Sequence, residues 1–442
     1  MEDYRGIADR VAARIADGRL RPGDRLPPQR VFARRHRIAG STAIRVYGEL
    51  ARRGLVVGEV GRGTFVRAAP PLPGFALAEP TGVAPVDLQL NYPVVEGQSE
   101  LMGRALAALA RADVLGEATG LPAAARGTAP AREAAAGLLA RADWTPDPDG
   151  VLFAGNSRQG IAAAVSHLVP AGGRLGVEEL TYPLVKAVVE RLGVRLTPIA
   201  TDGEGMRPDA LAAAHRATPL SGVYLQPTLH NPTATTAGTA RRGELATVLG
   251  ESGLTAVEDT TWAFLEPGAP APLAAYAPER VILVDSLSKR LAPGLTVGYL
   301  VAPAPRREAL AAVLRSGAWT AGGLALAAAT RWAGDGTIAE VEAAKRADVA
   351  VRGALVRRHL GAFGLRTAPH AYSCWWDLPA PWRAESFVAA AARAGVAVTP
   401  GSAFAVGAAA APDAVRIGLA SPPPEVLDAA LARLAALAAT RP

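Results

Sequence analysis

The chain has 442 residues and half of them are hydrophobic, which is enough apolar material for two or three packed domains and argues against an unfolded chain. A single cysteine, Cys374, excludes an internal disulfide framework, and the apolar stretches are interrupted before they reach the roughly 18 residues of a membrane-spanning helix. No charged and then apolar leader opens the chain, so we expect a cytoplasmic protein.

The net charge of +7 is distributed unevenly. Residues 1–67 contain 15 arginines and 7 acidic residues, a net of +8, while the rest of the chain has a net charge of −1. A small basic segment in front of a neutral remainder favours a polyanionic partner such as nucleic acid, with a merely solvated basic surface as the alternative.

Three short helices are expected before residue 52. The first has its apolar residues on one face and stops at Asp17-Gly18, the second opens at Pro27-Pro28 and ends near His36, and the third is capped by Ser41 and runs through Ala51. The apolar face of the first helix consists of Ile7, Val11 and Ile15.

A two-stranded wing with a glycine-rich tip is expected to follow over residues 55–66, which read Leu-Val-Val-Gly-Glu-Val-Gly-Arg-Gly-Thr-Phe-Val. Helix, turn, helix and wing within about 60 residues are typical of a DNA-binding module. The sequence therefore predicts that the basic segment binds DNA.

This module resembles a known family. Residues 19–30, 45–50 and 61–66 are similar to the winged helix-turn-helix of GntR-type regulators, and the resemblance covers residues 4–67. One departure is that Ala39-Gly40 stands where that family usually has Ser-Arg, which removes a contact to base or phosphate. The resemblance implies that the following positions touch DNA: Arg30, Ser41, Thr42, Arg45, Arg62, Gly63 and Thr64.

Residues 68–86 contain five prolines and little periodicity, which indicates a semi-extended linker. Beyond it, short β-rich runs alternate with helical stretches, as expected for a mainly parallel sheet covered by helices on both faces. We therefore expect two tethered units without a continuous core between them.

Three of these β-rich runs end in residues capable of chemistry. The run at 222–225 leads to Asn231, the run at 255–258 leads to Asp259, and the run at 281–284 leads to Lys289, one of only three lysines among the 47 basic residues. Ligands of open α/β sheets gather at the carboxyl ends of the strands. Amide, carboxylate and amine together are what pyridoxal phosphate requires: the lysine forms the Schiff base, the carboxylate keeps the ring nitrogen protonated, and the amide contacts the ring oxygen.

Further parts of such a site have weaker signals. The turn at 154–160 lies between an apolar strand and a helix, and so offers backbone N–H groups to a phosphate. Tyr182 is either a residue that stacks on the cofactor ring or an ordinary core tyrosine. Arg416 is either a clamp for a carboxylate or a member of a structural ion pair.

Residues 87–442 resemble the fold-type-I aminotransferase domain, most specifically over Ser286-Leu-Ser-Lys-Arg-Leu-Ala-Pro-Gly-Leu-Thr-Val-Gly-Tyr. A GntR-type domain fused to such a domain is the arrangement of the MocR/GabR regulators. The resemblance implies a pyridoxal-phosphate-binding transcription factor, usually a head-to-tail homodimer, that senses an amine or amino acid effector, with Arg416 as an effector contact. It implies a cofactor site made of Lys289, Asp259, Asn231, Tyr182, Ser157, Arg158, Gln159, Ser286 and Ser288.

We expect the following division of the chain. A winged helix-turn-helix occupies residues 1–67 and a linker occupies 68–86. A large α/β cofactor domain with a mainly parallel sheet occupies 87–330, and a smaller α+β subdomain occupies 331–442. The histidines show no metal-ligand spacing, so no metal site is expected.

Two departures from the aminotransferase pattern keep other functions open. Thr296 replaces the arginine that grips the phosphate, a loss of roughly 1.5–3 kcal/mol or about ten- to a hundredfold in affinity, for which Arg158 or Arg290 are candidates to compensate. The tyrosine expected after Asp259 is absent, with Thr-Thr-Trp at 260–262 instead. The alternatives are an aminotransferase with an appended DNA-binding domain, and a regulator whose pocket has lost the cofactor and binds another ligand.

Overall fold

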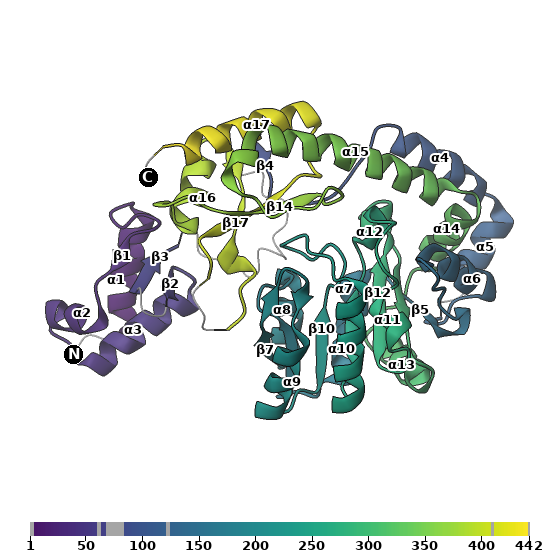
Figure 1. The fold of residues 1–442 in the computed structure, drawn as a ribbon, viewed down its shortest axis with the longest axis horizontal. Coiled ribbons are helices and arrows are strands. Elements are labelled where there is room, and N and C mark those ends of the chain that lie inside the picture. Colours follow the sequence, from purple (N-terminus) through teal and green to yellow (C-terminus); the bar gives the residue numbers. More distant parts are fainter. Residues whose placement is uncertain (1–3, 60–62, 68–83, 121–123, 408–410, 441–442) are drawn as a thin grey trace.

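A computed structural model describes residues 4–59, 63–67, 84–120, 124–407 and 411–440. It has a small N-terminal domain, a large α/β domain and a smaller subdomain that contains the C-terminal helix (Figure 1). No described helix is long and apolar enough to cross a membrane.

The N-terminal domain packs three helices against a three-stranded antiparallel sheet of order β1-β3-β2. As predicted, Ile7 and Val11 are buried on one face of the first helix. The prediction that Ser41 caps the third helix is wrong: this helix begins at Gly40, and Ala39 takes the cap position without a side-chain bond. The elements are α1 (Tyr4–Ala16), β1 (Arg25–Leu26), α2 (Gln29–His36), α3 (Gly40–Arg52), β2 (Val56–Glu59) and β3 (Gly63–Val66).

The large domain is built on a seven-stranded sheet of order β5-β13-β12-β11-β10-β6-β7. All neighbours pair in parallel except β13, which is antiparallel to both β12 and β5. The strands are β5 (Val151–Ala154), β6 (Arg174–Glu178), β7 (Arg195–Ile199), β10 (Gly222–Leu225), β11 (Ala256–Asp259), β12 (Val281–Ser286) and β13 (Gly298–Val301).

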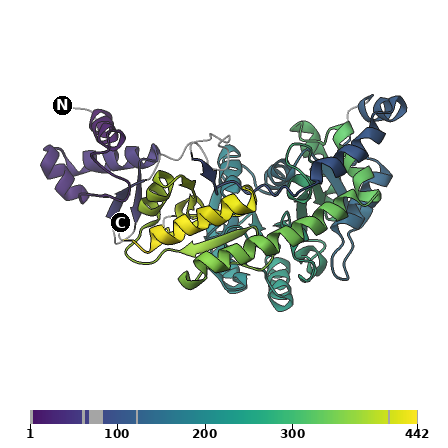
Figure 2. The same ribbon diagram turned by 90° about the horizontal axis from the view of Figure 1, so that it is seen from above.

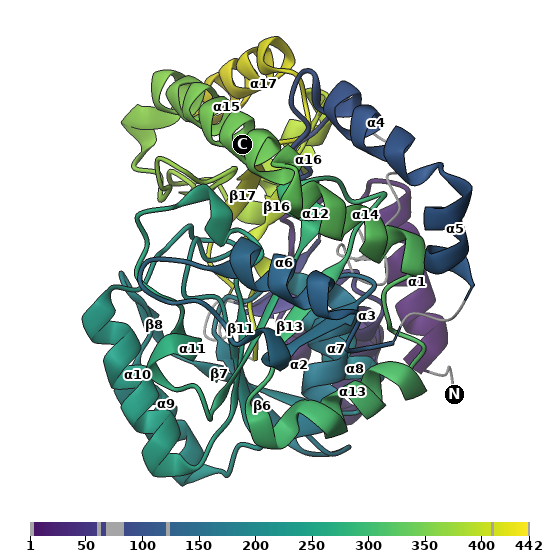
Figure 3. The same cartoon turned by 90° about the vertical axis from the view of Figure 1, so that its right-hand side faces the viewer.

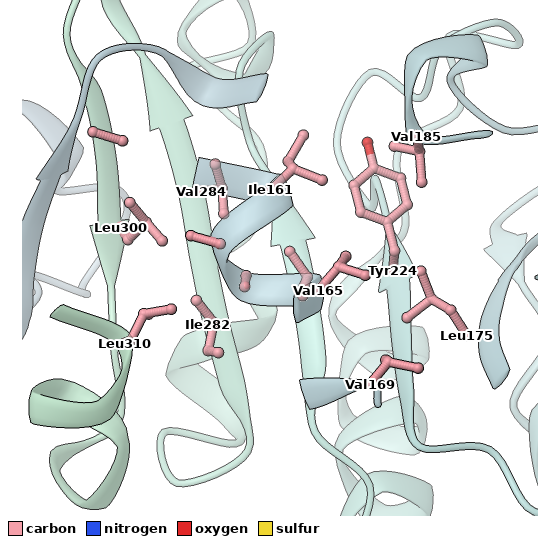
Figure 4. Close-up of a cluster of buried hydrophobic side chains, with 14 of the residues drawn as sticks. Ile161, Val165, Val169, Leu175, Val185, Tyr224, Ile282, Val284, Leu300 and Leu310 are labelled. Atoms are coloured by element: carbon pink, nitrogen blue, oxygen red, sulfur yellow. The ribbon is translucent and has the colours of Figure 1, made fainter. Parts of the chain in front are cut away.

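Both faces of this sheet are covered, so consecutive strand residues alternate between two cores. Val257 and Ile282 face α7 (Ser157–Leu168), α8 (Pro183–Arg191) and α13 (Arg307–Ser316), in the cluster drawn in Figure 4. Their neighbours Ala256 and Leu283 face the opposite side. The helices packed on that opposite side are α9 (Pro208–Ala217), α10 (Thr239–Ser252) and α11 (Leu273–Tyr276).

One end of the large domain is extended by a layer of helices around α14, which packs against α6, α5 and α4 (Figure 3). Two further small elements are a hairpin beside the sheet and the short helix α12 directly after β12. The bounds are α4 (Gln98–Leu109), α5 (Ala112–Thr119), α6 (Ala129–Leu139), β8 (Thr201–Asp202), β9 (Gly205–Met206), α12 (Leu287–Arg290) and α14 (Gly323–Gly334).

The smaller subdomain has a three-stranded antiparallel sheet of order β14-β17-β16 and a separate parallel pair, β15 with β4. Because β4 (Val86–Asp87) precedes the large domain in sequence, the chain enters the smaller subdomain before it reaches the large sheet. The other elements are β14 (Ser373–Asp377), α15 (Thr337–Leu360), α16 (Ala384–Arg393), β15 (Val396–Ala397), β16 (Thr399–Pro400), β17 (Ala414–Gly418) and α17 (Pro424–Ala438).

The N-terminal domain lies at one end of the molecule, beside α16 (Figures 1 and 2). The Arg383 guanidinium is 3.7 Å from the centre of the Phe65 ring of β3. A Cβ added to Gly23 would lie 3.0 Å from the Cβ of Ser386, so the backbone of the N-terminal domain touches α16 there as well. The two units therefore touch through a small contact, and no shared hydrophobic cluster joins the parts described here.

Lys345 ties α15 to the C-terminal end of α12. Its side chain is fully buried, and its Nζ donates to the backbone oxygens of Lys289 at 2.9 Å and Leu291 at 2.7 Å. Burial lowers the pKa of Lys345 from 10.5 to about 7, although the Glu342 and Asp348 carboxylates oppose this. Near pH 7 about half of the amine is therefore protonated, and above that pH it becomes largely neutral, when it still has two N–H groups to donate.

We expect this lysine to make the free energy of unfolding increase with pH. Between its folded pKa of about 7 and its unfolded pKa of 10.5, the unfolded chain binds a proton that the folded chain does not, so stability rises across this window and is flat below it. Urea unfolding at pH 7 and pH 9 should show a smaller increase in Lys345→Met than in the wild type. Equal increases in the two proteins would contradict this assignment.

Candidate cofactor and DNA-binding sites

Asn231, Asp259 and Lys289 lie at one edge of the large sheet, because β10, β11 and β12 are parallel neighbours. Asp259 is the last residue of β11, Lys289 lies on α12 directly after β12, and Asn231 follows β10. Arg416 comes from β17 of the smaller subdomain and is also near, since its charge helps to lower the pKa of Lys289. The tertiary structure thus brings four separate segments to one pocket.

The Lys289 amine lies in an aromatic corner of this pocket. Its Nζ donates to the Asn91 backbone oxygen at 2.7 Å and lies 3.7 Å from the centre of the Tyr92 ring and 5.1 Å from that of Trp262. Burial lowers the pKa of Lys289 well below 10.5, and the charges of Arg158 and Arg416 add to this effect. A lysine with a depressed pKa has more unprotonated amine at neutral pH, which is the nucleophilic form.

Asp259 is buried and accepts four hydrogen bonds. Its Oδ2 accepts from the Tyr224 hydroxyl at 2.8 Å and from Gln226 Nε2 at 2.9 Å. Its Oδ1 accepts from the Thr261 backbone N–H at 3.0 Å and from the Thr261 hydroxyl at 2.7 Å. Burial raises the pKa of Asp259, and these hydrogen bonds oppose the rise.

Asn231 is joined to Asp259 through Gln226, whose Oε1 accepts from the Asn231 backbone N–H at 3.1 Å. The side-chain oxygen of Asn231 is buried without a hydrogen-bond partner among the described residues, and so is Nε of Arg416. Buried polar atoms normally have partners, so these two unpaired atoms are available to a polar ligand.

The turn before α7 joins β5 to a capped helix N-terminus. The Asn156 side chain caps the helix by accepting from the Gln159 backbone N–H at 3.0 Å, and Ser157, Arg158 and Gln159 form the first turn. A Cβ on Gly298 would lie 2.5 Å from the Asn156 backbone, so glycine is what lets β13 pass this close to the turn. Free N–H groups and the helix dipole at such an end favour a phosphate.

Serine and threonine hydroxyls are the other side chains expected near the phosphate. The Ser286 hydroxyl accepts from the Ser288 backbone N–H at 3.3 Å, and the Ser288 hydroxyl lies 2.8 Å from that of Thr296. The structure therefore places a pair of neutral hydroxyls where the related pattern has an arginine.

Of the two arginines offered as replacements, Arg158 is in the pocket and Arg290 is not available. Arg158 donates to the Tyr92 hydroxyl at 3.1 Å and also interacts with Tyr182, at the N-cap of α8. Arg290 is buried and holds Asp285 with both Nε and an Nη, at 3.1 and 2.8 Å, and it also pairs with Glu342 at 2.5 Å. Its donors are used within the protein core.

Arg416 is buried and is held in place rather than paired. One of its terminal nitrogens donates to the Gln89 backbone oxygen and to the Thr399 hydroxyl, and its guanidinium lies 5.6 Å from the centre of the Phe404 ring. No described carboxylate forms an ion pair with it, so the structural ion pair considered from the sequence is not present in the described residues. Burial lowers the pKa of Arg416 to about 10.

Two models of known protein families match the chain. The model described as "Aminotransferase class I and II" matches residues 86–434, and the one described as "Bacterial regulatory proteins, gntR family" matches residues 3–66. The chain belongs to the class I and II aminotransferase family. Its gntR-family domain implies DNA binding, and the aminotransferase fold implies pyridoxal phosphate.

Two bacterial proteins named as transcriptional regulators are similar to this chain. The Bacillus subtilis "Uncharacterized HTH-type transcriptional regulator YdeF" is 28% identical over 95% of this chain and 90% of its own length. The Corynebacterium glutamicum "HTH-type pyridoxine biosynthesis transcriptional regulator PdxR" is 26% identical over 69% of this chain and 67% of its own.

Solved structures of the family agree on the fold. An archaeal alanine:glyoxylate aminotransferase superposes with a TM-score of 0.72 at 20% identity, over 80% of this chain and 90% of its own. The α-aminoadipate aminotransferase LysN of Thermus thermophilus gives 0.71 at 22% identity, over 80% and 91%. The fold-type-I architecture expected from the sequence is therefore confirmed.

The DNA-binding face of the gntR-family domain is only partly described. Arg30, Ser41 and Arg45 are exposed, Thr42 is half-exposed, and Arg62 lies outside the described residues. Gly63 and Thr64 are half-exposed at the start of β3. Ile44 on α3, next to Arg45, was not singled out from the sequence, although it is 58% exposed and is therefore a further surface candidate.

Several residues of the site were not singled out from the sequence. Tyr224 and Gln226 stand at the carboxyl end of a strand and Thr261 lies two residues after Asp259, so their spacing was a usable signal. Asn91 and Tyr92 precede Lys289 by almost 200 residues, and nothing local in the sequence marks them.

We expect Thr296→Arg to tighten cofactor binding by about ten- to a hundredfold, because it restores a charge-assisted hydrogen bond beside Ser288. The dissociation constant of pyridoxal phosphate, measured by equilibrium dialysis, tests this. Thr296→Met is the matched control for side-chain bulk without charge and should not bind more tightly than the wild type. An unchanged constant in Thr296→Arg would show that the phosphate is held elsewhere.

Proposed function

We propose that this chain is a DNA-binding transcriptional regulator that senses an amine or amino acid through Schiff-base exchange at Lys289. The observation that carries the proposal is that a single chain joins a gntR-family domain to a pocket in which a lysine of lowered pKa lies close to a buried carboxylate. Relatives that are similar to this chain over most of their length are named as transcriptional regulators, which supports the regulatory part of the proposal.

In this proposal the residues of the pocket divide the work by their chemistry. Pyridoxal phosphate, when bound, supplies an aldehyde for the lysine and a ring that withdraws electrons. Lys289 would supply the amine, Asp259 would accept a hydrogen bond from the ring nitrogen, and Asn231 would contact the ring oxygen. The first turn of α7 would hold the phosphate, with Ser157, Arg158, Gln159, Ser286 and Ser288 around it, and Tyr182 would stack on the ring.

Arg416 gives the effector a second point of attachment. An unpaired guanidinium near the reactive amine binds a carboxylate with two parallel hydrogen bonds. We therefore propose an amino acid as the preferred effector class. We also propose the division into residues 1–67, 68–86, 87–330 and 331–442, and a head-to-tail homodimer.

The second candidate function is an aminotransferase with an appended DNA-binding domain, which the class I and II fold favours. One experiment distinguishes the regulator from the enzyme. Amines and amino acids are screened for a saturable change in the cofactor's absorption, and the same solutions are assayed for keto acid. A change without product supports sensing, while turnover supports the enzyme; neither response in a protein that does not take up cofactor supports a pocket converted to another ligand.

We expect Arg45→Ala to weaken DNA binding by about tenfold and to reduce the salt dependence of binding by about one unit of slope, since one phosphate contact is lost. The probe is a DNA fragment selected from a random pool by the wild-type protein, and binding is measured by fluorescence anisotropy across a salt series. Arg393→Ala, an exposed arginine of α16, is the control and should leave both quantities unchanged. Wild-type affinity and slope in Arg45→Ala would remove Arg45 from the DNA contact.

A further inference from the structure

The carboxylate of Asp259 is held by neutral groups alone. Its two oxygens accept from the hydroxyl of Tyr224, the amide of Gln226, and the backbone N–H and hydroxyl of Thr261, at 2.7 to 3.0 Å. A carboxylate has about four lone-pair sites, which these four donors match, so a ring N–H would share an oxygen with one of them. This is a full set of donors for an anion, and it exists before any ligand binds.

The donors are themselves fixed in place. The ring of Tyr224 is fully buried among Val165, Leu175 and Val185, and its hydroxyl is at the far end (Figure 4). Gln226 is held at both ends, because its backbone N–H donates to Glu178 at 2.9 Å and its Oε1 accepts from Asn231.

These donors oppose the cost of burying a charged carboxylate. Burial raises the pKa of Asp259, because the charged form loses its hydration, and the hydrogen bonds from Thr261, Tyr224 and Gln226 lower it again. Three other titratable groups lie near Asp259, whose charge raises the pKa values of Lys289, the buried Glu178 and Tyr182. Without the neutral donors, the pKa of this carboxyl would therefore be higher still.

We propose that Tyr224, Gln226 and Thr261 are positioning residues that keep Asp259 ionised in the cofactor-free protein. When pyridoxal phosphate binds, they keep the proton between Asp259 and the ring nitrogen on the ring nitrogen. The second half rests on the proposed function, and the first half does not. Donors that stabilise the carboxylate favour the ion pair of carboxylate and ring N–H over the neutral pair, in which the proton would move to Asp259. The assignment of an ionised Asp259 therefore depends on residues of β10 and of the turn after β11.

The first test uses the cofactor-free protein. The carbonyl stretch of protonated Asp259 is identified in the infrared by comparison with Asp259→Asn and followed with pH. Tyr224→Phe and Thr261→Val each remove one hydroxyl while keeping the side-chain shape, and each should raise the midpoint by about one pH unit or more. Tyr299→Phe removes another buried phenol of the same sheet, away from Asp259, and should not move it.

The second test uses pyridoxal phosphate labelled with ¹⁵N in the ring. The ¹⁵N chemical shift should show a less protonated ring nitrogen in Tyr224→Phe and Thr261→Val than in the wild type or in Tyr299→Phe. We expect the ratio of protonated to unprotonated ring nitrogen to fall by about tenfold. An unmoved infrared midpoint in both variants, or an equal shift in Tyr299→Phe, would overturn the proposal. If the wild type takes up no labelled cofactor, the proposed function fails, and the infrared result still decides the role of the donors.

Discussion

Lys289→Ala should abolish the visible absorption band that pyridoxal phosphate acquires when it is linked to a lysine. The reason is that the other two lysines are committed elsewhere: Lys186 donates to the carbonyls of Ala403 and Ala405, and Lys345 to those of Lys289 and Leu291. No other described amine is therefore placed to react. The measurement is the absorption spectrum with and without added cofactor.

The control for this variant is Lys186→Met, which removes a lysine outside the pocket and should keep the band. DNA binding of Lys289→Ala without effector should match that of the wild type, since α1 to β3 form their own core. Response to amines should be lost. A lysine-type band that persists in Lys289→Ala would contradict the assignment, and no band in the wild type at saturating cofactor would indicate a converted pocket.

Arg290→Met should destabilise the folded protein by about 3–5 kcal/mol, the usual loss when one partner of a buried ion pair is removed. The side chains of Arg290 and Asp285 are 3% and 1% exposed, and methionine would leave Asp285 buried without its bidentate partner. Asp285 would keep the hydrogen bond from the Thr260 hydroxyl at 3.0 Å, which does not supply charge. Urea unfolding measures the change.

The control for Arg290→Met is Arg111→Met. Arg111 also forms a close pair, with Asp113 at 2.8 Å, but these side chains are 70% and 63% exposed. Exposed pairs contribute roughly 0–1 kcal/mol, so this variant should unfold almost like the wild type. Equal stability of the two variants would mean that the interior of the protein accommodates an unpaired Asp285. A weakened cofactor affinity in a folded Arg290→Met protein would return Arg290 to the phosphate site.

The sequence determined the local elements well because their signals are local. The three helices and the wing of the first domain follow from apolar periodicity and from proline and glycine positions. The cap was misplaced, since Ser41 and Gly40 are both compatible with a helix start, and the third strand of the sheet, β1, was not expected. The convergence of Asn231, Asp259 and Lys289 was also predictable, because parallel strands end at a common edge.

The scarcity of lysine was a weaker guide than it seemed. None of the three lysines is exposed, and each of them donates to a backbone carbonyl within the fold. The scarcity of lysine thus indicated that each lysine has a specific role. At Lys186 and Lys345 that role is to donate hydrogen bonds within the fold. Only the neighbours in space distinguish these from the reactive candidate.

What the tertiary structure alone decided is which long-range partners each polar group has. Arg158 and Arg290 looked equally able to replace the missing arginine at 296, and the fold commits Arg290 to Asp285 and Glu342 while leaving Arg158 in the pocket. Asn91 and Tyr92 reach Lys289, and Tyr224 reaches Asp259, through contacts across distant segments. Periodicity and spacing record the local preferences of a chain, whereas hydrogen bonds and ion pairs between distant segments depend on how the strands are ordered and packed.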